Sequence, residues 1–398
     1  MTDTAPAFDF SSLPVVDNHL HPYLISHGGS RYAPLESFLG MPGEDEAARA
    51  HRDAMLYQRW ATRQLAAFLG CDAEPGVVAA ARAEQGDERV WAERLFRDQN
   101  IEALVVDTGY PQPPLDMDGF RAVTPADIFT IYRIEPAIAA LLDAGANWDE
   151  FVRSFDRGVV RAIQDEGFLG LKSIIAYRTG LEIDVAHESD AAGQAGLDMA
   201  LANPDAMMAS KALRDHLLLR AFRLAVDLDV PFQIHTGIGD RDIVLERCNP
   251  APLNTVLKRE PYRNARVILI HTYPYVAEAS WMAAALPNVW MDLSEGVPFA
   301  VAAVDRIFAT ALELAPVNRI LYGSDAFAGP EQIWLGAKIA KAALGRVFTS
   351  LYQRDLVTEE EARDAARAIM AGNARALYGL LGLRMTAGRP AGDTRLTP

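Results

Sequence analysis

Eight short apolar runs, separated by stretches of helical character, constrain the fold of this chain more than any other feature. The intervening stretches are often rich in alanine and leucine at helical spacing, as in 206–228 and 276–286. Near-continuous apolar runs that alternate with helices are typical of parallel strands covered on both faces. The predicted strands are Leu13–His21, Ile101–Gly109, Phe129–Pro136, Phe168–Ala176, Val230–Thr236, Arg266–Thr272, Asn288–Ser294 and Arg319–Ala326.

The number of these units favours a closed barrel. Eight strand–helix repeats predict an α/β chain folded as a (β/α)8 TIM barrel, with an open doubly wound sheet as the alternative. An open sheet of that kind often carries a glycine-rich dinucleotide or phosphate loop after a strand. None of the eight runs is followed by such a loop, which weighs against the open sheet.

A barrel of this type needs about 250 residues, so a chain of 398 residues carries a surplus. Residues 30–98 look helical and polar and follow the first strand, where we expect a cap over the barrel mouth or an arm for dimerisation. Residues 177–205 are expected to form a loop over the mouth. We expect one domain over 1–385, with a last helix whose Thr358-Glu-Glu-Glu start is an N-capping pattern, and a flexible tail over 386–398.

Composition and charge exclude several classes of protein. The net charge is −15 and no dense block of lysine and arginine occurs, so nucleic acid is not expected as a partner. No apolar run reaches 18 residues, and the first ten residues do not resemble a secretory signal. Two cysteines form no disulfide framework. We expect a cytoplasmic homo-oligomer that binds a small molecule and does not bind membranes.

Polar side chains with metal-binding chemistry stand at the carboxyl ends of five predicted strands. Those ends and the loops after them build the active site in barrel enzymes. One histidine after an apolar run is usually structural, but the whole set is hard to explain in that way. The residues are His19 and His21 on the first strand, Lys172 on the fourth, His235 on the fifth, His271 on the sixth and Asp325 on the eighth.

Two or three imidazoles with one carboxylate can bind a divalent cation and leave a position for water. We expect zinc, with manganese and iron as alternatives, and the ion would lower the pKa of that water toward roughly 7. Asp325 would be both a ligand and the general base, and His271 a second ligand or a group that polarises the substrate carbonyl. Lys172 is either carbamylated and bridges two ions, or is an ammonium that binds a substrate anion or closes an ion pair. One ion and two ions both remain open.

These residues resemble those of the amidohydrolase superfamily. The stretches Val16-Asp-Asn-His-Leu-His21, Ile320-Leu-Tyr-Gly-Ser-Asp325 and Asn373-Ala-Arg-Ala-Leu-Tyr-Gly379 are similar to its family 2 branch. The stretches 171–180, 271–275 and 323–331 resemble a narrower group, in which this domain is fused to glutamine-synthetase-like domains in nodulin-type proteins. We expect the barrel and its insertion to use all 398 residues, with no synthetase-like domain.

The resemblance implies a metal-dependent barrel enzyme. It implies His19, His21, His235 and Asp325 as metal ligands, and His271 as a further ligand or a catalytic histidine. Because glutamine-synthetase-like enzymes join amines to the γ-carboxyl of glutamate, the association suggests a hydrolase that cleaves γ-glutamyl amides with metal-activated hydroxide. A metal-dependent decarboxylase or other lyase of a small organic acid, and a non-catalytic barrel module, are the alternatives.

Four residues are candidates for binding such a substrate. Arg178 or Arg133 could bind an α-carboxylate, and Glu135 could bind an α-ammonium group. An apolar wall for the amine could be formed by Tyr273, together with Tyr275, Trp290 and Phe327. Each of these residues could instead belong to a rim salt bridge or to the core.

Overall fold

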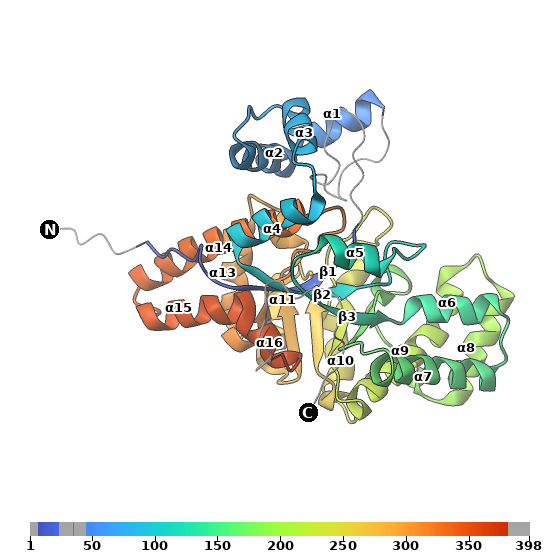
Figure 1. Ribbon diagram of the computed structural model, residues 1–398. Coiled ribbons are helices and arrows are strands. Elements are labelled where there is room, and N and C mark those ends of the chain that lie inside the picture. The colour runs from blue at the N-terminus through green and yellow to red at the C-terminus, as the bar shows by residue number, and fades with distance from the viewer. Residues whose placement is uncertain (1–6, 24–34, 36–44, 381–398) are drawn as a thin grey trace.

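The computed structural model (Figure 1) describes residues 7–23, 35 and 45–380. It contains a sheet of eight parallel strands in the order β1 to β8. Backbone hydrogen bonds from Asn18 N–H to the Tyr322 carbonyl (2.9 Å) and from Asp325 N–H to the His19 carbonyl (2.8 Å) join the two ends of the sheet. The predicted (β/α)8 barrel is confirmed. Its strands are β1 (Val15–Leu20), β2 (Ile101–Asp107), β3 (Asp127–Arg133), β4 (Leu171–Ser173), β5 (Phe232–His235), β6 (Val267–Ile270), β7 (Val289–Asp292) and β8 (Ile320–Leu321).

Most strands are shorter than the apolar runs that predicted them, because the runs continue into the loops of the barrel mouth. Strand β4 has three residues and β8 has two. Strand β3 ends at Arg133, and Glu135 is the first residue of helix α6 (Glu135–Asp143) rather than part of the strand. The proline that follows Glu135 is well suited to the first turn of a helix.

The barrel interior is closed at its lower end by the last helix. Val16, Val105 and Ile268 are among the alternate strand residues that face inward, where they pack against Leu377 and Tyr378. Tyr378 is the first residue after helix α16 (Asn373–Leu377). The α16 label lies below the barrel in Figure 1. Because this end is filled with apolar side chains, the opposite, carboxyl end of the strands is the open one.

Helices cover the outside of the barrel, and a larger apolar core lies between them and the sheet. The predicted helices over 206–228 and 276–286 correspond to α9 and α11. Besides α6, the outer helices are α5 (Met117–Val123), α7 (Trp148–Gln164), α8 (Asp190–Ala202), α9 (Lys211–Asp227), α10 (Asn254–Leu257), α11 (Val276–Ala285), α12 (Gly296–Phe299), α13 (Val304–Leu314), α14 (Pro330–Gln353) and α15 (Glu359–Arg367).

The sequence predicted a loop over 177–205, but the structure shows that this segment is partly helical. It contains a 3₁₀ turn (Val185–Glu188) and helix α8, which packs along α9. Ser189 caps α8 by accepting a hydrogen bond from Ala192 N–H (3.2 Å). Further 3₁₀ turns lie at Ile175–Tyr177, Met207–Ser210, Leu245–Cys248, Ala251–Leu253, Tyr262–Asn264 and Val317–Arg319, and a π-helical turn at Ala368–Gly372.

The described part of the insertion after β1 is helical, as predicted, with α1 (Glu46–Ala54), α2 (Leu56–Leu69), α3 (Pro75–Ala83) and α4 (Glu88–Gln99). It is tied to α14 by Glu331, whose Oε1 accepts from Arg82 Nε (2.7 Å) and from Trp91 Nε1 (2.5 Å). In Figure 1, α1 to α3 stand above α4 and the barrel. A role as cap or dimerisation arm stays a prediction, as does the division into one domain.

The C-terminal segment begins with the capping box that the sequence indicated. Thr358 Oγ1 accepts from Glu361 N–H (3.2 Å), and Glu361 Oε2 accepts from Thr358 N–H (2.7 Å). The predicted last helix is divided into α15, the π-helical turn and α16. The tail over 386–398 lies outside the described residues. Within the described residues, no helix has the length and apolar character needed to cross a membrane.

Candidate metal centre

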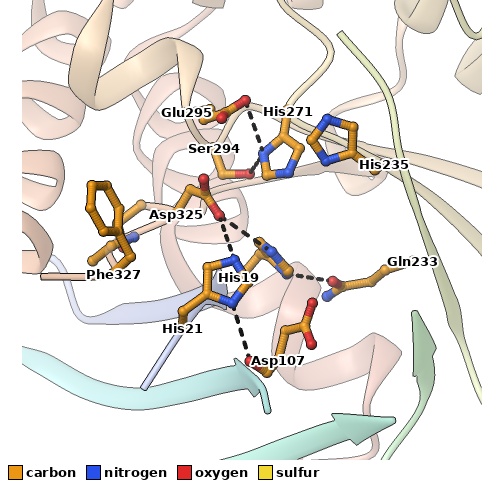
Figure 2. Close-up of polar contacts among 12 residues, drawn as sticks. His19, His21, Asp107, Gln233, His235, His271, Ser294, Glu295, Asp325 and Phe327 are labelled. Carbon is orange, nitrogen blue, oxygen red and sulfur yellow. Dashed lines mark hydrogen bonds and ion pairs between the residues drawn. The ribbon is translucent and has the colours of Figure 1, made fainter. Parts of the chain in front are cut away.

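His19 and His21 present one ring nitrogen each to the same point at the open end of the barrel (Figure 2). The Nδ1 of His19 lies 2.7 Å from Gln233 Oε1, and the Nδ1 of His21 lies 3.1 Å from the Asp107 carbonyl. Since both partners are oxygen acceptors, each Nδ1 carries the proton and each Nε2 keeps its lone pair. Metal-binding histidines are oriented in this way, by a fixed acceptor on the nitrogen that faces away from the ion.

Asp325, which follows β8, completes this group. Its Oδ1 lies 3.3 Å from His19 Nε2 and 3.5 Å from His21 Nε2, and it has no hydrogen-bond donor among the described residues. Lone pairs that converge in this way repel one another unless a cation lies near them, either a metal ion or the ammonium group of Lys172, whose Nζ lies 3.4 Å from His19 Nε2. Ligand atoms about 2.1 Å from a tetrahedral zinc ion are about 3.4 Å apart, so the spacing suits a divalent cation.

His235 and His271 add two more neutral imidazoles beside this group, with ring centroids 4.4 Å apart. His235 Nε2 donates to the Ile238 carbonyl (3.0 Å), which leaves the Nδ1 lone pair free. His271 Nδ1 lies 2.9 Å from Ser294 Oγ, and the hydroxyl proton of Ser294 is used by Asp292. His271 Nδ1 therefore donates to Ser294, and its Nε2 lone pair is available.

Burial keeps these rings uncharged. It lowers the pKa of His19 to about 4, with a further contribution from the charge of Lys172, and holds the pKa values of His235 and His271 well below the usual 6.5. A neutral imidazole is the form that binds a metal ion. The donor set thus fits a divalent cation in both geometry and protonation.

Lys172, on β4, lies beside the same group. Its Nζ is 3.4 Å from His19 Nε2, and only 1% of the residue is exposed. Burial lowers the pKa of Lys172 to about 8. The lysine is therefore near enough to act with the histidines, either as a carbamate or as an ammonium group.

A cavity of about 750 Å³ opens over this cluster. His21, His235, His271, Lys172 and Asp325 lie on its wall, whereas His19 is fully buried and does not line it. Charges of both signs line it. The cationic side chains are Arg133, Lys172, Arg178 and Arg214, and the carboxylates are Glu135, Asp143, Asp240, Asp242, Glu295 and Asp325.

The predicted substrate-binding residues differ in their surroundings. Arg133 forms a two-point ion pair with Asp107, with contacts of 2.5 to 3.2 Å. Glu135 Oε1 accepts hydrogen bonds from Ser173 Oγ (2.6 Å) and Ile174 N–H (2.9 Å), and its Oε2 has no partner among the described residues. Arg178 is half-buried on the cavity wall.

Of the aromatic residues suggested as a wall for the amine, Phe327 lines the cavity. Tyr273 does not: its side chain packs against Gly296, and its carbonyl accepts from Ile238 N–H (2.7 Å). Trp290 lies away from the mouth, under the Arg319 guanidinium. The part of Tyr273 in substrate binding stays a prediction without a contact to support it.

Five residues at the site went unnoticed in the sequence, because nothing in their local pattern distinguishes them. Gln233 and Ser294 orient His19 and His271, and Tyr177 packs against the His235 ring at 4.6 Å. The one usable signal was position. Gln233 is a polar residue inside an apolar strand, Ser294 and Glu295 lie in the turn after β7, and Arg214 and Tyr177 follow the same strand as Arg178.

Comparison with known proteins agrees with the fold. The sequence pattern of the family described as amidohydrolase matches residues 145–380, and the chain belongs to this family. It is 29% identical to the protein fluG of Emericella nidulans over 92% of its own length, and spans 46% of that relative. A Lactobacillus casei protein, provisionally assigned as a metal-dependent hydrolase, is 28% identical with a TM-score of 0.81, over 94% of this chain and 98% of that one.

A more distant structure shares the fold alone. Glucuronate isomerase from Caulobacter crescentus is 14% identical with a TM-score of 0.65, over 96% of this chain and 94% of the isomerase. The family and the Lactobacillus structure together make the protein an enzyme of the metal-dependent hydrolase class.

Proposed function

We propose that this enzyme hydrolyses a C–N amide bond, and that its substrates are γ-glutamyl amides. The observation that carries the proposal is the convergence of His19, His21 and Asp325 under a cavity whose wall carries both guanidinium and carboxylate groups. Such a wall suits a substrate with charges of both signs, as in the amino acid head of a γ-glutamyl group.

His19, His21 and Asp325 would hold a divalent cation, with zinc as our first choice and manganese or iron as alternatives. His235 and His271 would complete the ligand set. The ion would supply a water of lowered pKa and would polarise the amide carbonyl. Gln233 and Ser294 would keep the two histidines that they contact in the tautomers that leave Nε2 free.

The protein's own groups would move the proton. Asp325 would accept a proton from the water molecule while the water oxygen attacks the carbonyl carbon. The C–N bond then breaks, and Asp325 returns the proton to the leaving nitrogen, so that the products are a carboxylate and a free amine. Lys172 and His271 lie on the cavity wall next to Asp325, where either can stabilise the negative charge that develops on the carbonyl oxygen.

The glutamyl head would bind at the side of the cavity formed by Arg178 and Glu135. The guanidinium would pair with the α-carboxylate, and the unpartnered Glu135 Oε2 would accept from the α-ammonium. Arg133 is already paired with Asp107, so it would act mainly by holding that wall in place. The resemblance to barrels fused to glutamine-synthetase-like domains supports the same substrate class.

The test is a screen of γ-glutamyl amides and N-acyl amides with the metal-loaded enzyme, in which free amine is measured. We expect amine and glutamate in equal amounts, no turnover after exhaustive chelation, and both metal retention and turnover lost in Asp325→Asn. Amine release that survives chelation would contradict the proposal. Release of CO2 from a small organic acid without amine would favour the decarboxylase alternative.

We also propose a homo-oligomeric, cytoplasmic protein. Light scattering after size-exclusion chromatography tests the first part, since a mass of 43.5 kDa would show a monomer. Fractionation of cells that express the chain tests the second.

A further inference from the structure

One side of the cavity is formed by a face of helix α6. The lining residues on this helix recur at helical spacing, and they are Glu135, Pro136, Ala139, Ala140 and Asp143. Glu135 is buried against Ser173, the residue after Lys172, whereas Asp143 is exposed. At 1.5 Å per residue the face extends about 12 Å between these two carboxylates. The cavity is therefore long enough to hold a head group beside the reacting bond.

Two guanidinium groups also lie on this side of the cavity. Arg178 follows β4, and Arg214 is in the first turn of α9. Both residues are half-buried, and neither forms an ion pair with a carboxylate in the described part of the chain. Arg133, by contrast, is paired with Asp107. The cavity thus holds two cationic groups that the protein itself does not neutralise.

Ser210 fixes the orientation of Arg214. Its Oγ accepts a hydrogen bond from Arg214 Nε (2.8 Å) and donates one to the Met207 carbonyl (2.7 Å). The hydroxyl proton is therefore used, and the oxygen is held as an acceptor for the guanidinium. Neither terminal nitrogen of Arg214 has an acceptor among residues 7–23, 35 and 45–380. This pair of nitrogens is the part of a guanidinium that can bind both oxygens of a carboxylate.

This arrangement is unfavourable in the free protein. Burial lowers the pKa of Arg214, Glu135 opposes that shift, and the like charge of Arg178 adds to it. A half-buried charge without a partner costs free energy. Groups of this kind are kept at binding sites, where activity is maintained at the expense of stability and a ligand supplies the missing charge.

A buried carboxylate beside the two guanidiniums identifies the ligand more closely. Only 6% of Glu135 is exposed, and its Oε2 lacks a donor among the described residues. A ligand that places an anion on Arg178 and Arg214 and a hydrogen-bond donor on Glu135 would satisfy all three groups. An amino acid head, with its α-carboxylate and α-ammonium on one carbon, has these two groups side by side.

We propose that Arg214 determines substrate specificity, because it and Arg178 hold the α-carboxylate of the substrate between two guanidinium groups. A carboxylate has about four acceptor positions, so it can serve two such groups. Ser210 is a positioning residue for Arg214. The inference rests on the proposed function and extends it, since it makes the α-carboxylate a requirement. Amides whose acyl group lacks that carboxylate are expected to be poor substrates.

The test is calorimetric titration of the metal-loaded protein with L-glutamate and with 4-aminobutyrate, which is glutamate without the α-carboxylate. We expect the wild type to prefer glutamate. Arg214→Met should weaken glutamate binding about 10- to 100-fold and leave 4-aminobutyrate unaffected. Arg157→Met is the matched control, since Arg157 also donates to a serine, Ser154 (3.2 Å), but is exposed on α7.

Two results would overturn the inference. The first is equal glutamate affinity in Arg214→Met and the wild type. The second is a wild type that binds no glutamate, or binds it no better than 4-aminobutyrate. Arg214→Lys keeps the charge but loses the paired donors, so it should recover only part of the affinity.

Thermal unfolding separates binding from a structural role. Because Arg214→Met removes a half-buried charge that lacks an acidic partner, the Tm of the ligand-free variant should equal or exceed that of the wild type. A lower Tm, with the same loss of affinity for both ligands, would show that Arg214 is structural and would overturn the inference.

Failure of this inference can be distinguished from failure of the proposed function. If no γ-glutamyl amide releases amine, while glutamate binding still depends on Arg214, only the proposed function is wrong. If amine is released with the same KM in the wild type and Arg214→Met, only the role of Arg214 is wrong.

Discussion

Gln233 offers a sharp test of how the metal centre is built, because it touches no candidate substrate position and acts through His19. Its Oε1 accepts from His19 Nδ1 (2.7 Å), and its Nε2 donates to the Asn18 carbonyl (2.9 Å) and to Tyr378 Oη (2.8 Å). In Gln233→Leu, His19 loses the acceptor that fixes its tautomer. The proton can then move to Nε2, where it blocks the lone pair that faces Asp325.

Loss of such an orienting partner weakens metal binding about 10- to 100-fold, which corresponds to about 1.4 to 2.7 kcal/mol. The metal-free protein should also lose about 1 to 3 kcal/mol of unfolding free energy for each buried polar group left unpaired. Competition against a fluorescent chelator measures the first effect, and urea unfolding of the chelated protein measures the second.

Tyr378→Phe is the matched control. It removes the phenol oxygen that accepts from Gln233 and donates to Asn18 Oδ1 (3.0 Å), but leaves the contact between Gln233 and His19 intact. We expect a loss of about 1 kcal/mol in stability with little change in metal affinity. Equal metal affinity in Gln233→Leu and the wild type would refute the reasoning, because it would show that His19 needs no fixed tautomer.

Three further predictions concern stability. Thr358→Ala removes the capping box with Glu361 and should cost about 1 kcal/mol in urea unfolding, without an effect on metal binding; no loss would contradict the cap. Arg82→Ala breaks a buried ion pair with Glu331 and should cost about 3 kcal/mol or more, so a change below 1 kcal/mol would show that the insertion is held by other contacts. Burial lowers the pKa of Lys341 from 10.5 to about 8, so between these values the unfolded chain binds more protons. Lys341 therefore makes the free energy of unfolding increase with pH across that window. Urea unfolding from pH 7.5 to 10 should show a smaller increase in Lys341→Met than in the wild type.

The sequence predicted the fold because burial on both faces leaves a strong signature in parallel strands. It did not predict strand ends. β4 pairs over three residues, yet its apolar run extends to Ala176, because Ile175 and Ala176 are buried in a 3₁₀ turn rather than in the sheet. Hydrophobicity reports burial and not strand pairing, so a run that leaves the barrel and stays buried looks the same as a longer strand.

The sequence predicted the candidate site only at positions where the residue type is itself a typical metal ligand. Histidines and an aspartate at the ends of strands stand out, and the structure brings the Nε2 atoms of His19 and His21 within 3.5 Å of Asp325 Oδ1. Glu295 did not stand out, because its place on the cavity wall depends on a γ-turn that no sequence pattern marks. Gln233 was missed since its role depends on a contact across 214 residues.

The central claim is that His19, His21 and Asp325 share one divalent cation at the open end of the barrel. Crystals of the metal-loaded enzyme, measured with X-rays above and below the absorption edge of the metal, test this directly. The account predicts an anomalous peak within about 2.0 to 2.3 Å of the Nε2 atoms of both histidines and of an oxygen of Asp325. A peak bound elsewhere, or a fully loaded crystal without a peak among these three residues, would contradict it.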